Sequence, residues 1–245
     1  MSRWLTLLIC LLLAAPAVAA IDFENDDGDD YLTASGQFFT GGGSTPPFSF
    51  IFWFVLEDGA TDLARWASWG SNLNRFLGHA YATNAGFQAR NTTAYEALSG
   101  NAALDDVAYA YAATAASATD RRVVLAGDWA NSGTSTSSSN PNSASLARIG
   151  WAQDGLNTHD GLWWGSSVYA DAVSRSQIEG LAAGLHPFSI RSETLTHYWS
   201  MRGNTGDAVG TVYDRVGSLD MTAVGAPVYA ETPPKIKHHY HHMGG

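Results

Sequence analysis

The stretch "DGLWWGSSVYADAVSRSQIEGLAAG", residues 160–184, decides the fold because it joins a strand pattern to a short, clearly delimited helix pattern. Ser174 occupies an N-cap position, and Gln177 three residues later completes a capping box. Gly184 ends the pattern, which predicts one capping helix near residues 175–183. A helix of about two and a half turns is too short to be stable alone, so we expect it to pack on another element.

Strand patterns fill most of the remaining chain. Residues 48–56 are apolar almost throughout, as expected for a strand that is buried on both faces. Residues 102–118 are ambiguous, because their many Ala residues favour a helix. Val107, Tyr109 and Tyr111 nevertheless alternate with Ala, which suits a half-buried strand. Similar runs bounded by turn residues predict further strands at 31–34, 63–69, 76–82, 86–90, 121–129, 146–151, 162–170 and 195–201. Many short strands with one helix predict an all-β protein, either a β-sandwich or a jelly roll.

The composition restricts the class of protein and of partner. The 245 residues suit one large β domain or two small ones, and a hydrophobic content of 45% with 9 Trp can fill a core. The net charge of -10 argues against nucleic acid as a partner. Only 15% of the residues are charged, a composition that is common in extracellular β proteins.

Residues 1–20 predict a signal peptide. Arg3 precedes an apolar run over residues 5–13, and small residues at 17–20 offer a cleavage site. The alternative is an N-terminal hydrophobic anchor that is retained. We therefore expect a secreted protein or one on an extracellular surface, with no membrane contact unless the segment is retained. The single cysteine, Cys10, lies in the apolar run, so the predicted mature chain has no disulfide.

The segments "DYLTASGQFF", "PFSFIFWFVL", "RRVVLAG" and "ARIGWAQDG", together with the opening stretch, resemble a known family. They are similar to laminin-G-like, concanavalin A-like domains of the kind found in phage and bacterial surface proteins. The resemblance implies a two-sheet antiparallel jelly-roll sandwich over residues 21–190, whose last strand leads into a helix that caps the edge. It also implies a C-terminal extension over 191–233 that packs on the same sandwich, followed by a His-rich tail at 234–245.

The chain departs from this family where acidic residues are common. Gly165, Ser166 and Ser167 stand where the family often has Asp-Glu, and the hairpin reads Ala126-Gly127-Asp128 instead of Asp-Gly. The family contains lectins, structural modules and glycosidases, so the resemblance alone does not assign a function.

The sequence lacks the acidic motif of glucanases with this fold. Retaining hydrolysis requires two carboxylates about 5–5.5 Å apart, which strand residues at i and i+4 can supply. The nearest pair among the glutamates is Glu179 and Glu193, too distant in sequence for such a motif. No Gly-x-Ser-x-Gly or His-Glu-x-x-His motif occurs. We therefore predict that the protein is not an enzyme.

Aromatic and polar residues near turns are the candidate ligand-binding residues. Trp163 and Trp164 are adjacent, so alternation turns one ring inward and the other outward, where it can stack on a sugar unless a loop covers it. Trp rings with Asn and Asp side chains on loops suit glycan binding, although such residues also serve turns. The other candidates of this kind are Trp129, Asn131, Trp151, Asp154, Asn157, His159 and Asp160.

The segment "DFENDDGDD", residues 22–30, is the candidate metal site. Its crowded carboxylates repel one another, and calcium would relieve this repulsion. Calcium is therefore the expected cofactor, with Asp26, Asp27, Asp29 and Asp30 as ligands; the alternative is a solvated acidic turn. The tail motif "HHYHH" at 238–242 either binds a transition metal or is a flexible end.

Three functions follow from these observations. The first is a non-catalytic exported module that recognises a glycan or surface polysaccharide, in recognition or adhesion at a cell or particle surface. The second is a structural, decoration or assembly component of a phage virion or surface layer, whose partners are neighbouring proteins. The third is a divergent polysaccharide hydrolase or lyase.

Overall fold

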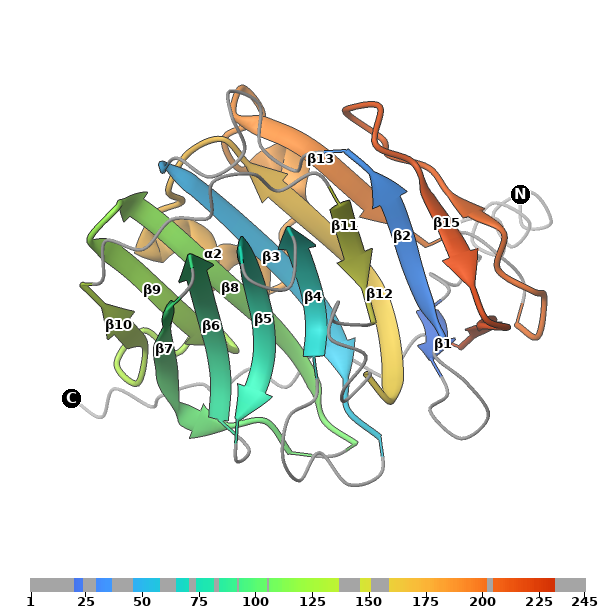
Figure 1. The fold of residues 1–245 in the computed structure, drawn as a ribbon, viewed down its shortest axis with the longest axis horizontal. Coiled ribbons are helices and arrows are strands. Elements are labelled where there is room, and N and C mark those ends of the chain that lie inside the picture. Colours follow the sequence, from blue (N-terminus) through green and yellow to red (C-terminus); the bar gives the residue numbers. More distant parts are fainter. Residues whose placement is uncertain are drawn as a thin grey trace, which may run out of the picture.

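The computed structural model describes the strands, the helices and most of the turns between them. The described residues are 20–23, 30–36, 46–57, 65–70, 74–81, 84–91, 93–104, 106–136, 146–150, 159–201 and 205–231. Their strands form two antiparallel sheets of 8 strands each, which lie face to face (Figure 1). This is a jelly-roll sandwich, as the sequence predicts, and the described residues include one short α-helix.

The first sheet, here called sheet A, has the order β10-β9-β8-β3-β12-β1-β16. β13 also pairs with β12, along the part of β12 that β1 leaves free. The strands of sheet A are β1 (Ala20–Phe23), β3 (Phe48–Val55), β8 (Ala108–Ser117), β9 (Asp120–Leu125), β10 (Gly133–Ser135), β12 (Gly161–Tyr169), β13 (Leu195–Ser200) and β16 (Val228–Ala230).

The second sheet, here called sheet B, faces the viewer in Figure 1. Its order is β14-β15-β2-β11-β4-β5-β6-β7. Its strands are β2 (Tyr31–Ser35), β4 (Arg65–Gly70), β5 (Asn74–Tyr81), β6 (Asn84–Asn91), β7 (Thr93–Ala102), β11 (Leu146–Ile149), β14 (Thr211–Val212) and β15 (Met221–Val224).

Aromatic residues fill the space between the sheets. Every second residue of β3, from Phe48 to Phe54, points inward and is fully buried. Phe50 packs against Trp69 of sheet B with ring centroids 5.1 Å apart, and Phe52 stacks on Trp163 at 6.0 Å. Burial of one large apolar side chain contributes about 1.5–3 kcal/mol, so this layer is a main source of stability.

The helix α2 (Arg175–Ala182) covers the outer side of sheet A, away from the viewer in Figure 1. Ile178 and Leu181 are buried in a second apolar cluster with Trp53 and Tyr169. The predicted capping box at the start of the helix is present. A 3-10 turn, η1 (Pro187–Ser189), follows the helix.

Several strand ends differ from the predicted ones because glycine or a positive φ angle interrupts the extended backbone. β9 stops at Leu125, since Ala126 and Gly127 have φ angles of 56° and 74°. β11 stops at Ile149, since the next residue, Gly150, has a φ of 89°.

The sequence missed β1, β7, β10 and β14 to β16, most of which are very short. The C-terminal strands extend both sheets: β13 and β16 belong to sheet A, and β14 and β15 belong to sheet B. Residues 1–19 and 232–245, which hold the predicted leader and the His-rich tail, lie outside the described residues. No described helix has the length and apolar character that a membrane crossing requires.

Candidate functional site

Two of the predicted ligand-binding residues lie in the core. His159 and Trp163 are both 0% exposed. The His159 ring makes edge contacts with the rings of Phe23, Phe52 and Phe54, with centroids 5.9–6.3 Å apart. Apolar side chains between the sheets surround both rings, so neither side chain is accessible from the surface in this structure. Burial lowers the pKa of His159 to about 4 against a smaller opposing effect from the backbone of Leu162, so the ring is neutral at pH 7.

Trp164 has the predicted outward orientation. It is half-buried and packs against the apolar clusters on both sides of sheet A. The pairing of β12 with β3 shifts register between Trp163 and Gly165, at the position of Trp164. Trp164 is therefore only partly buried, and it remains a candidate.

Trp129 and Asn131 lie on a loop that Asp128 holds together. The Asp128 carboxylate accepts hydrogen bonds from Asn101 Nδ2 and Asn131 Nδ2 at 2.9 and 2.8 Å. Partial burial acts to raise the pKa of Asp128, but these bonds and two from the loop backbone outweigh it and hold the pKa below its usual value. Arg122 covers the Trp129 ring at 4.3 Å from its centroid. Asp128 and Asn131 thus form hydrogen bonds that stabilise this loop, and Arg122 covers Trp129.

Three acidic residues, Asp22, Asp30 and Asp160, lie close enough for their charges to interact. Burial raises the pKa of Asp22, and the nearby charges of Asp160 and Asp30 raise it further. Asp22 Oδ1 is buried and forms no hydrogen bond with any described residue, whereas Asp30 Oδ1 accepts one from the Ala226 amide at 2.7 Å. Within the described ranges, no three His, Cys, Asp or Glu side chains are arranged to hold a metal ion.

Six of the predicted site residues lie outside the described residues. Three of them belong to the predicted glycan-binding set and three to the predicted calcium ligands. They are Trp151, Asp154, Asn157, Asp26, Asp27 and Asp29.

Three rings and one leucine form an exposed group beside the helix that the sequence did not predict. This group, here called the aromatic patch, consists of Leu185, His186, Phe188 and Tyr198. Phe188 is 47% exposed and Leu185 is 53% exposed. The His186 and Phe188 rings stack at 5.4 Å with an interplanar angle of 8°, and Tyr198 contacts both rings edge-on. The sequence offered one signal for this patch. Phe188 directly follows Pro187, shortly after Gly184 ends the helix.

Local hydrogen bonds fix the geometry of the aromatic patch. His186 Nδ1 accepts the Phe188 amide proton at 3.3 Å, and His186 Nε2 lies 3.3 Å from the Tyr198 hydroxyl. Below the patch, the buried Tyr169 hydroxyl donates to the Pro187 carbonyl at 3.2 Å. The rings are therefore ordered before any ligand arrives.

Comparison with solved structures finds the same fold in distantly related proteins. A protein from Bacteroides ovatus that carries a provisional carbohydrate-binding assignment superposes with a TM-score of 0.66 at 17% identity. The match covers 90% of this chain and 62% of that one, so this chain spans less than two thirds of its length. A heptameric SAP-like pentraxin from Limulus polyphemus superposes with a TM-score of 0.59 at 12% identity, covering 88% of this chain and 96% of that one. No protein-family model matches the sequence, and no curated protein matches it.

Proposed function

We propose that the chain is a non-catalytic, exported binding module that recognises a glycan, and that the aromatic patch forms part of the sugar-binding surface. The exposed Phe188 ring, held by His186 and Tyr198, carries this proposal. An aromatic face provides an apolar surface for the C–H groups of a sugar, and the Tyr198 hydroxyl beside it can exchange hydrogen bonds with sugar hydroxyls.

The order within the patch supports a binding role. A ligand that meets rings already fixed by hydrogen bonds does not have to immobilise them, so less conformational entropy is lost on binding. Two exposed large apolar side chains within four residues also favour a contact surface over a solvated turn.

The shared fold supports the same class of function. The Bacteroides ovatus protein provides a precedent for this sandwich with a carbohydrate-binding assignment, although fold alone does not assign a ligand. A glycan ligand agrees with an extracellular location and with the few charges in the chain.

We propose that calcium binds the acidic segment over residues 22–30, with Asp26, Asp27, Asp29 and Asp30 as ligands. At the ends of this segment, the charges of Asp22, Asp30 and Asp160 interact. The support is the mutual repulsion of these carboxylates and the buried Asp22 oxygen, which forms no hydrogen bond with the described residues. Asp26, Asp27 and Asp29 lie between Asp22 and Asp30 in the sequence and would supply further oxygen ligands.

A glycan array probed with the purified protein, once with calcium and once with EDTA, tests both proposals. We expect selective binding to a few glycans, and weaker binding in EDTA if calcium orders the site. A silent array in both conditions would contradict glycan recognition and favour the structural function, in which the aromatic patch contacts a neighbouring protein of a virion or surface layer.

A further inference from the structure

A further exposed ring lies beside the aromatic patch, on the segment that pairs with β13 along the edge that β12 does not occupy. Trp199 of β13 and Asp214 form an antiparallel β-bridge, and the Arg215 amide donates to the Tyr198 carbonyl at 2.7 Å. Tyr198 is therefore opposite Arg215. By the same register, Tyr213 is opposite residue 200, two positions further along β13.

Tyr213 shares the outward face of Tyr198. The side chains of Trp199 and Asp214, which lie between them in the pairing, point inward and are both 0% exposed. Successive residues of an extended segment face opposite sides, so the side chains that flank this bridge point outward. Tyr213 is 58% exposed, which is more than Phe188. The aromatic patch therefore continues toward a second exposed ring.

The spacing of these rings exceeds the size of one sugar. Tyr198 and Tyr213 occupy diagonal positions across the paired segments, and such positions lie roughly 7–8 Å apart. The rings of Phe188 and Tyr198 are a further 5.6 Å apart. A pyranose ring is about as large as one tyrosine ring, so a single sugar cannot cover both Phe188 and Tyr213. Neighbouring units of one chain can.

Hydrogen bonds fix the backbone on both sides of Tyr213. The Asp214 carboxylate accepts from the amides of Tyr198 and Gly217 at 3.1 and 3.0 Å, and the Asp214 amide donates to Asp220 Oδ1 at 2.9 Å. A ring on a backbone that is already ordered loses less conformational entropy when a ligand binds. Tyr213 is thus held in place in the same way as the rings of the aromatic patch.

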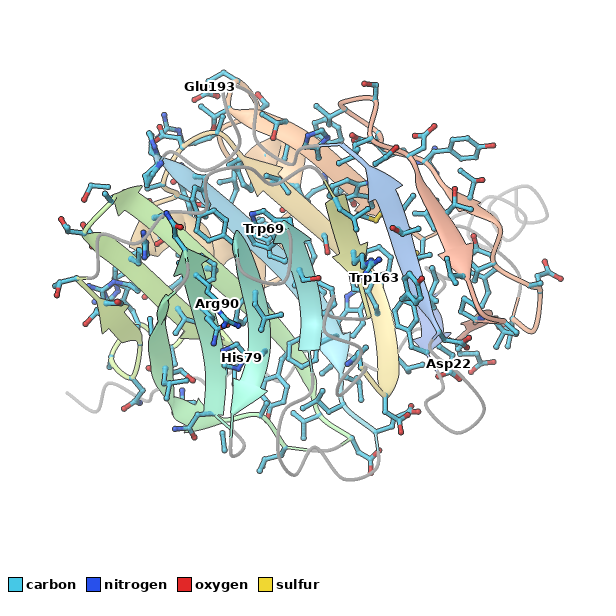
Figure 2. All side chains as sticks on the ribbon, viewed as in Figure 1. Asp22, Trp69, His79, Arg90, Trp163 and Glu193 are labelled. Carbon is cyan, nitrogen blue, oxygen red and sulfur yellow. The ribbon has the colours of Figure 1, made fainter. Side chains whose placement is uncertain are left out.

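An ion pair holds the segment that carries Phe188. Arg191 Nη2 lies 2.6 Å from Asp171 Oδ2, and Arg191 Nε lies 3.3 Å from Glu193 Oε1. Glu193 is exposed at the periphery of the molecule (Figure 2), so solvent screens the second pair and it contributes little. The shorter and less exposed pair with Asp171 is the stronger tie between this segment and the end of β12.

We propose that the aromatic patch and Tyr213 form one platform for a linear, uncharged oligosaccharide, in which Phe188 and Tyr213 contact different sugar units. This inference rests on the proposed glycan-binding function and names the class of its ligand. An extended chain can lie flat across rings on one face, and the hydroxyls of Tyr198 and Tyr213 and the exposed Arg215 can bond to its hydroxyls. The net charge of -10 disfavours an anionic chain.

The dependence of affinity on chain length tests this proposal. The probes are the cellulose, xylan, mannan and chitin series, each from the monosaccharide to the hexasaccharide, with the maltose series as a reference for a curved chain. We expect the affinity for at least one extended series to rise with length and then to level off. Binding that does not depend on length, tighter binding of the maltose series, or no binding of any extended series would overturn the proposal.

Variants of single rings locate the two ends of the platform. Tyr213→Ala should weaken binding of the hexasaccharide about tenfold and leave the shortest chain that binds unaffected, since the lost ring contacts only a distant unit. Phe188→Ala should weaken binding of every length. Leu104→Ala is the control, because it removes an apolar side chain of similar exposure elsewhere. The same gain with length in Tyr213→Ala as in the wild type would overturn the assignment of Tyr213.

Two further variants keep the test decisive if Tyr213→Ala does not fold. Tyr213→Gln removes the ring but keeps a long polar side chain, and it should lose the gain with length at an unchanged unfolding temperature. Tyr213→Phe keeps the ring and should retain most of this gain. If the wild type binds glycans without any dependence on length, this inference fails while the proposed function stands. If Phe188→Ala binds as the wild type does, the aromatic patch fails.

Discussion

At the scale of the residue, burial determined the roles of Trp163, Trp164 and His159 more than their chemistry did. Alternation predicted that one ring of the Trp163–Trp164 pair faces outward, and Trp164 does. The sequence could not show that His159, which follows a run of loop residues, enters a cage of phenylalanine rings. That placement depends on the packing of strands that are distant in sequence.

His159 should make stability depend on pH. Its pKa falls from 6.5 in the unfolded chain to about 4 in the fold. Between these values the unfolded chain holds a proton that the folded protein lacks, so the free energy of unfolding decreases as the pH falls through this window. The expected loss is about 3 kcal/mol when the pH reaches the lower value.

Urea unfolding of the wild type and of His159→Leu at a series of pH values from neutral to acidic measures this effect. The wild-type free energy of unfolding should fall more steeply than that of the variant. Parallel curves would show that His159 does not titrate as its burial requires.

At the scale of the element, the helix was the most predictable part of the fold. The Ser174 side chain accepts from the Gln177 amide, and Gln177 Oε1 accepts from the Ser174 amide at 2.7 Å. Both contacts are local, so the sequence specifies them without knowledge of the fold. The long apolar strand at 48–56 was predictable for the same reason, whereas β1 was not, because it is stable only between β12 and β16.

Replacement of the N-cap residue should lower the free energy of unfolding. Ser174→Ala removes one acceptor for the helix N-terminus and should lower the free energy of unfolding by about 1 kcal/mol. Ser192→Ala, at an exposed turn position, is the matched control and should have little effect. An equal change in both variants, measured by chemical denaturation, would contradict the capping role.

At the scale of the whole molecule, Asp214 ties the C-terminal segment to the sandwich. Its buried carboxylate accepts hydrogen bonds from His197 Nδ1 and from the amides of Tyr198, Gly217 and Leu219. β13 belongs to sheet A, and β15, the next strand after Asp214, belongs to sheet B, so this cluster joins the two sheets. The resemblance implied that the extension packs on the sandwich, but no local pattern indicated this buried carboxylate.

Asp214→Asn should destabilise the protein by about 3 kcal/mol at pH 7, because a hydrogen-bonded buried charge is lost. Burial acts to raise the pKa of Asp214, but the bonds from His197 and the backbone outweigh it and lower the pKa. The stabilisation is therefore present above the unfolded pKa and is lost as the pH falls through the lower folded value. The difference between wild type and variant should shrink below about pH 4, and Asp120→Asn on the exposed surface should show no such difference. A constant difference would refute this role.

The aromatic patch on the outer side of sheet A is the proposed glycan-binding surface. The most direct measurement is a calorimetric titration of the best-binding glycan with the wild type, with Phe188→Ala, and with Leu104→Ala as a control that removes another exposed apolar side chain. We expect about tenfold weaker binding for Phe188→Ala, which corresponds to about 1.4 kcal/mol, and unchanged binding for the control. Equal affinity in all three proteins would contradict the claim that the aromatic patch binds the glycan.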